Sequence, residues 1–107
     1  MSNLDIPNAI GEIAMRMLMI ILNSEVREEM EILLKREGVE GYTEIPDVRG
    51  YGSTGPRMGS AVHPETSSVI MVLLEDTKLT ELLKTIDSYC TSCKQHVKIV
   101  HWPVETV

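Results

Sequence analysis

Aromatic and basic side chains are scarce in this chain of 107 residues. It has no phenylalanine, one tryptophan and three tyrosines, and its 10 basic side chains stand against 16 acidic ones, for a formal net charge of −6. General nucleic-acid binders use clustered lysine and arginine for phosphate, and single strands need aromatic platforms for stacking. The composition therefore argues against nucleic acid and against an anionic membrane surface, although a local basic group could still bind one nucleotide.

Cysteines and long apolar runs are also few. The two cysteines, Cys90 and Cys93, form a single C-x-x-C, whereas small secreted domains need a larger disulfide framework. The longest apolar run, residues 17–22, is far shorter than the roughly 20 residues of a membrane-spanning helix. The first fifteen residues contain Asp5 and Glu12 and lack the basic start of a signal peptide. We therefore expect a soluble, cytoplasmic protein with reduced thiols.

Two segments predict central β-strands, each followed by a helix. Residues 17–22 and 69–74 are apolar at every position, which is typical of strands buried on both faces. After each of them, apolar side chains recur at the helical period, and a polar capping residue precedes the recurrence. The caps are Asn23 or Ser24 and Asp76 or Thr77, and the apolar stripes are Val26, Met30, Leu33 and Leu34, then Leu79, Leu82, Leu83 and Ile86.

Two further strands complete the order β-α-β-β-α-β. Residues 41–48 contain Pro46, which suits an edge strand or a bulge, and residues 97–102 form a last strand that ends at Pro103. This order predicts an α+β, ferredoxin-like fold, in which a four-stranded antiparallel sheet carries both helices on one face. Right-handed crossovers place the first and third strands in the centre and the other two at the edges.

The second face of this sheet is predicted to be apolar and uncovered. One parity of residues 17–22 and 69–74 lies on it, and these residues are Leu, Ile, Met and Val. An apolar surface of this size is not left to water, so we expect copies of the chain to associate through it. We assign residues 16–107 to this domain and residues 1–15 to an N-terminal extension, either a sticky apolar stripe or a loosely docked arm.

A glycine-dense loop, residues 50–66, joins the second strand to the third. Backbone without a Cβ can approach a ligand closely, and loops longer than about 12–15 residues are uncommon unless they are functional or disordered. Arg49, just before the loop, and Arg57 within it could face an anion, and the loop's tyrosine could stack on a base. We predict a binding loop that is partly disordered until something binds, the alternative being a flexible hairpin. Its predicted ligand-binding residues are Arg49, Gly50, Tyr51, Gly52 and Arg57.

With this topology, the run Val48-Arg49-Gly50-Tyr51-Gly52 resembles the PII-like family of signalling proteins. Family members often carry V-K-G-x-G here, at the base of the so-called T-loop, which is shorter in this chain. The resemblance covers about residues 15–102. It implies a homotrimer with inward-facing sheets, a nucleotide in each cleft between subunits, and regulation of a target protein or membrane transporter through the loop.

A second match to this family is partial. The family carries T-G-x-x-G-D-G-K-I before its last strand, where the loop cradles nucleotide phosphates. Thr91, Lys98 and Ile99 stand at the corresponding spacing, whereas the glycines and the aspartate of the motif are replaced. The resemblance adds Thr91 and Lys98 to the ligand site and favours an adenine nucleotide. Alternatively, Lys94 and Lys98 are ordinary solvated lysines. The departures suit a divergent PII-like group that binds other nucleotides or metals, or accompanies transporters.

Two alternatives to nucleotide sensing stay open. Cys90, Cys93 and His96 offer two thiolates and an imidazole, which suit zinc or copper(I), so a metal-binding PII-like protein linked to heavy-metal tolerance or efflux is one of them. This motif lacks the second half of a structural zinc site, and its cysteines could instead be a core residue and a surface thiol. The other is an enzyme or an ACT-like amino-acid-binding domain, but without a catalytic constellation in the sequence we expect no enzyme.

Overall fold

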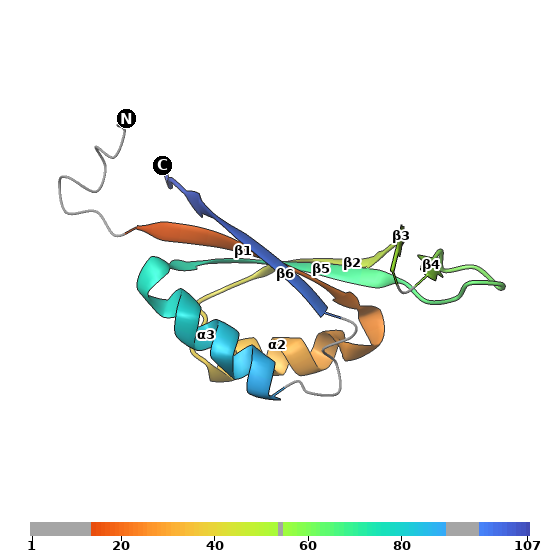
Figure 1. The fold of residues 1–107 in the computed structure, drawn as a ribbon, viewed down its shortest axis with the longest axis horizontal. Helices are drawn as coiled ribbons and strands as arrows, with labels where there is room; N and C mark the ends of the chain where they lie inside the picture. The colour runs from red at the N-terminus through yellow and green to blue at the C-terminus, as the bar shows by residue number, and fades with distance from the viewer. Residues whose placement is uncertain (1–13, 54, 90–96) are drawn as a thin grey trace.

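The computed structural model describes residues 14–53, 55–89 and 97–107, which form a four-stranded antiparallel sheet with both helices on one face (Figure 1). The strand order is β2-β5-β1-β6, so the first and third predicted strands are central and the ferredoxin-like prediction is confirmed. The elements are β1 (Met15–Asn23), the 3-10 helix η1 (Ser24–Val26), α2 (Arg27–Arg36), β2 (Thr43–Val48), β3 (Gly50–Gly52), β4 (Gly55–Arg57), β5 (Ser67–Glu75), α3 (Asp76–Tyr89) and β6 (Val97–Val104).

The core lies between the two helices and one face of the two central strands. Alternate residues of β1 and β5 point to this face because successive side chains of a strand point to opposite sides of the sheet. The predicted stripes of both helices pack against these residues, which confirms the helical periods. The buried core residues are Leu18, Ile20, Leu22, Ile70, Val72 and Leu74 from the strands, and Met30, Leu33, Leu34, Leu79, Leu82 and Ile86 from the helices.

The ends of the first helical segment follow from local hydrogen bonds. The Asn23 side chain accepts a 2.9 Å bond from the Glu25 N–H, so Asn23 is the cap. At the other end Gly38 has φ +81°, its N–H donates to the Lys35 carbonyl at 3.1 Å, and the Val39 N–H donates to the Leu34 carbonyl at 3.1 Å. These two bonds form a Schellman motif, which terminates α2 and turns the chain toward β2.

Both edge strands contain a proline. The register of β2 against β5 shifts between Ile45 and Val48, so Pro46 lies in a bulge of an edge strand, as predicted. The strand begins at Thr43 rather than at residue 41. The prediction that the last strand ends before Pro103 is wrong, because β6 pairs with β1 as far as Val104 and an edge strand tolerates proline.

The sheet face opposite the helices is apolar, as predicted. Cross-strand pairing aligns one parity of all four strands on it, and within the described residues no helix covers it (Figure 1). Its large side chains include Leu73, 40% exposed, and Trp102, 37% exposed. Neither helix of the described ranges has the length and apolar character needed to cross a membrane. We call the sheet surface opposite the helices the open face, and its apolar residues are Met15, Met17, Met19, Ile21, Ile45, Val69, Met71, Leu73, Val100, Trp102 and Val104.

The left-handed backbone of Gly38 gives a stability prediction. A Cβ at Gly38 meets no atom within 4 Å, so the cost of Gly38→Ala is conformational, about 1–2 kcal/mol. Gly41 also has open space around it but lacks the left-handed φ, so Gly41→Ala is the matched control. Urea unfolding should show a lower free energy of unfolding for Gly38→Ala only. Equal stability of the two variants would contradict the role assigned to this cap.

Candidate ligand-binding loop and its root

The first half of the glycine loop is a small β-hairpin. β3 and β4 pair through Gly50 with Arg57, Tyr51 with Pro56, and Gly52 with Gly55, and they project from the end of the main sheet (Figure 1). The loop therefore contains regular structure that its glycine content did not suggest. Tyr51 is 83% exposed on this hairpin, and Arg49, just before it, is also exposed.

The second half of the loop is a turn built from its own backbone. The N–H groups of Met58 and Ser60 donate to the His63 carbonyl at 3.3 and 2.9 Å, and the Gly59 N–H donates to the Glu65 carbonyl at 3.2 Å. The Ser60 hydroxyl accepts a further 3.1 Å bond from the His63 N–H. These bonds define the course of the backbone over residues 58–65.

Arg57 differs from the other predicted ligand residues because it is buried, with 7% of its surface exposed. Its guanidinium donates to the Glu65 carboxylate at 2.8 Å and so joins β4 to the following turn. A ligand contact by Arg57 stays a prediction, but this cation already braces the loop internally.

The remaining predicted site residues divide into two groups. Lys98 is exposed on β6, and pairing places it in one row with Ile21, Val69 and Ile45, near the end of the sheet from which the loop emerges. Thr91, Cys90, Cys93 and His96 lie outside the described residues. Among the described residues, no group of three or more His, Cys, Asp or Glu side chains is placed to hold a metal. The metal site therefore stays a prediction.

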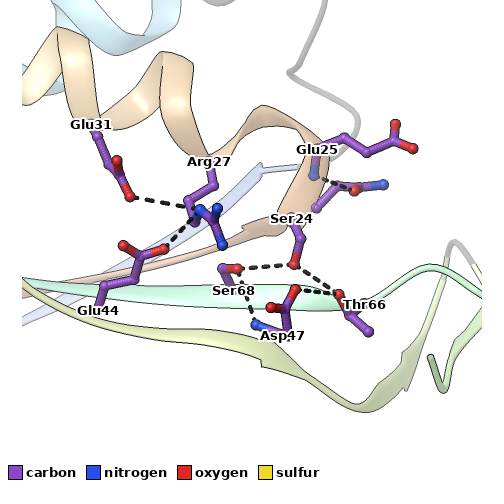
Figure 2. Close-up of polar contacts among 9 residues, drawn as sticks. Ser24, Glu25, Arg27, Glu31, Glu44, Asp47, Thr66 and Ser68 are labelled. Atoms are coloured by element: carbon purple, nitrogen blue, oxygen red, sulfur yellow. Dashed lines mark hydrogen bonds and ion pairs between the residues drawn. The ribbon is translucent and has the colours of Figure 1, made fainter.

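Four polar residues form a cluster at the root of the loop that the sequence analysis did not predict, although it named one of them, Ser24, as a possible helix cap. In the β2 bulge Asp47 has φ +54°, and its N–H points at the Ser68 hydroxyl at 3.4 Å. Ser24 lies 2.9 Å from both the Thr66 and the Ser68 hydroxyls, and Thr66 donates to Asp47 Oδ1 at 3.0 Å (Figure 2). Two features of the sequence could have indicated this cluster: Pro46 within a predicted strand, and the small polar Ser68 at the start of an apolar strand.

A charged cluster lies beside this root, between α2 and β2 (Figure 2). Arg27 Nε is 3.2 Å from Glu44 Oε2 and 3.7 Å from Glu31 Oε2. Glu44 Oε2 is buried and accepts no hydrogen bond, so the contact with Arg27 is an ion pair without hydrogen-bond geometry. A side-chain hydrogen bond with Glu31 raises the pKa of Glu44, burial and the Glu31 charge raise it further, and Arg27 opposes them.

The raised pKa of Glu44 gives a pH dependence of known sign. The unfolded chain ionises Glu44 near its ordinary pKa of 4.5, whereas the folded chain keeps the proton to higher pH. As pH rises through the interval between these two values, the unfolded state is favoured, so the stability contributed by Glu44 falls. The free energy of unfolding of wild type minus that of Glu44→Gln should therefore decrease from about pH 4 to about pH 7. A flat or rising difference for Glu44→Gln would contradict the assignment.

Comparison with solved structures places this architecture among PII-like proteins. CPII, a nitrogen regulatory PII-like protein from Thiomonas intermedia K12, bound to ADP, AMP and bicarbonate, matches with a TM-score of 0.71 at 21% identity, over 88% of this chain and 93% of that one. CPII bound to ADP and bicarbonate gives 0.65 at 25% identity, over 87% and 90%. A putative PII-like signalling protein from Thermus thermophilus gives 0.66 at 16% identity, over 89% and 90%.

Two comparisons of the sequence gave different results. A search of the curated proteins found no significant match to this chain. The family model described as nitrogen regulatory protein P-II matches residues 15–107, from the first residue of β1 to the end of the chain. The fold, the run from Val48 to Gly52 and this match agree, and the chain belongs to the P-II family of nitrogen regulatory proteins.

Proposed function

We propose that this chain is a trimeric PII-like signalling protein that binds an adenine nucleotide between subunits and regulates a partner protein or membrane transporter through its glycine loop. Membership of the P-II family supports a regulatory role rather than a catalytic one. The nucleotide is supported by CPII, a structural neighbour bound to ADP and AMP. Carry-over of this ligand to the present chain is part of the proposal.

The position of the cations in the sheet is the observation that carries the proposal. Arg49 follows the end of β2 at one edge, and Lys98 lies on β6 at the other edge, near the same end of the sheet. Three strand spacings of about 4.8 Å separate these edges by roughly 14 Å. One nucleotide would therefore meet both cations most directly where the β2 edge of one subunit lies beside the β6 edge of the next.

The open face supplies the driving force for such an arrangement. It is apolar across all four strands, and burial of apolar surface stabilises association by about 25 cal/mol per Å². Three copies that turn this face inward would bring the sheet edges of neighbouring subunits together. The same packing would leave the hairpin of β3 and β4, which projects from the end of the sheet, available to a partner (Figure 1).

Nucleotide binding should depend on Arg49. Because a charge-assisted hydrogen bond to phosphate contributes about 1.5–3 kcal/mol, Arg49→Ala should weaken ADP or AMP binding by about 10- to 100-fold in calorimetric titration. Lys84→Ala removes the same charge from an exposed position of α3 and should leave the affinity unchanged. Unchanged affinity of Arg49→Ala would remove this residue from the site, and a wild-type protein that binds neither nucleotide would contradict the proposed ligand.

The oligomer should depend on the open face. Leu73→Glu places a charge on a central strand of this face and should convert the assembly to monomers in light scattering coupled to size exclusion, since burying an unpaired charge is costly. Ile32→Glu makes the same kind of change on α2, where Ile32 is 60% exposed, and should leave the mass unchanged. An unaltered mass for Leu73→Glu would rule out association through this face.

A further inference from the structure

The four polar side chains at the loop root form a hydrogen-bond ring with one possible direction. An ionised carboxylate only accepts, so the Thr66 hydroxyl must donate its hydrogen to Asp47 Oδ1, 3.0 Å away. Thr66 then has no hydrogen left for Ser24, and Ser24 must be the donor in the 2.9 Å contact between their hydroxyls.

The same reasoning fixes the other half of the ring. Because the Ser24 hydrogen is used, Ser68 donates to Ser24 at 2.9 Å, and the Ser68 oxygen accepts from the Asp47 N–H at 3.4 Å. The ring therefore begins at the backbone of Asp47, passes through three hydroxyls in one direction, and ends at the carboxylate of Asp47 (Figure 2). Hydrogen bonds that run head to tail in this way polarise and strengthen one another.

The ring takes the place of a ladder bond that the bulge removes. Pro46 and Asp47 lie between the pairs that join Ile45 to Val69 and Val48 to Ser67, so two residues of β2 oppose Ser68 alone. Pro46 has no N–H, and the N–H of Asp47 finds a side-chain acceptor instead of a backbone carbonyl. Ser68 is fully buried, and both of these hydrogen bonds of its hydroxyl belong to the ring.

The ring also joins the two ends of the loop to a third element. Asp47 belongs to β2 shortly before the loop begins, Thr66 is the last residue of the loop, and Ser24 opens η1. The Ser24 N–H donates to the Thr66 carbonyl at 3.0 Å, which doubles the connection. The chain thus leaves and re-enters the sheet at points fixed against each other and against the start of the first helical segment.

We propose that Asp47 is a positioning residue, and that its ring with Thr66, Ser24 and Ser68 sets the direction in which the glycine loop leaves the sheet. Arg49 lies two residues beyond Asp47, so this direction decides where its guanidinium stands. The effect on nucleotide binding rests on the proposed function, whereas the effect on the loop itself does not.

Substitutions at Asp47 separate the ring from the backbone turn. Asp47→Asn keeps an acceptor oxygen and tolerates left-handed backbone, Asp47→Gly keeps the backbone freedom but loses the acceptor, and Thr66→Val removes one hydroxyl at nearly constant shape. The control is Thr85→Val. Thr85 lies on α3, outside the loop, and the substitution removes a hydroxyl that donates to Glu37 at 3.4 Å.

Two measurements on the full chain test the proposal. Amide hydrogen exchange of residues 49–66 should accelerate about tenfold or more in Asp47→Gly and Thr66→Val, and about twofold or less in Asp47→Asn and Thr85→Val, while the amides of β1 and β5 stay protected. ADP affinity should fall in Asp47→Gly and Thr66→Val and be retained in Asp47→Asn. Loop exchange in Asp47→Gly equal to that of wild type would overturn the proposal, because Asp47 would then serve only as a turn residue.

The two measurements, amide hydrogen exchange and ADP affinity, test the ring and the proposed function separately. If the wild-type protein binds no nucleotide, the proposed function is wrong and hydrogen exchange alone decides the role of the ring. If nucleotide binds but the exchange of loop amides is unchanged in either Asp47→Gly or Thr66→Val, the ring does not position the loop and the proposed function stands without it. If both variants lose protection throughout β1 and β5, the residues maintain the fold as a whole, which also overturns the positioning role.

Discussion

The apolar character of β1 and β5 on both faces is the constraint on which the rest of this structure depends. Their helix side is filled by the apolar stripes of α2 and α3, and that packing forms the core of the single domain. Their other side carries Met, Ile, Val and Leu at alternating positions. No helix of the described residues covers that side, so in the proposed assembly the same two strands that stabilise the monomer also face copies of the chain.

The elements of the candidate site lie where this regular packing ends. β2 is an edge strand with contacts to β5 alone among the strands of the sheet, so a bulge in it disturbs one ladder and leaves the core intact. The bulge lies just before the glycine loop. Within it the Ser68 hydroxyl accepts from the Asp47 N–H, and the hydroxyls of Ser24 and Thr66 complete the ring back to the Asp47 carboxylate. An irregular edge on regular central strands allows the loop to be exposed to solvent while its direction relative to the sheet stays fixed.

The fold was predictable from the sequence because its signals are local. Apolar runs, helical periods and Pro46 each report on a few neighbouring residues, and together they defined the strand order. The bounds of β6 were missed because proline signals a strand end unless the strand is known to be an edge. The root ring was not predictable in the same way, because Ser24, Asp47, Thr66 and Ser68 are ordinary polar residues until the bulge brings them together. The role of Arg57 within the loop was missed for the same reason: its charge predicted a ligand contact, which stays a prediction, but its ion pair with Glu65 becomes visible only once the loop is folded.

Each outer strand of the sheet carries a proline, Pro46 in β2 and Pro103 in β6. A proline has no N–H to donate to an added strand. Neither edge of the sheet therefore offers the full row of donors that would let two sheets pair edge to edge. Growth by strand addition at either edge would lack a hydrogen bond at the proline, which disfavours a continuous ribbon of sheets. For a monomer that exposes this much apolar sheet, the two prolines are a safeguard against fibril formation.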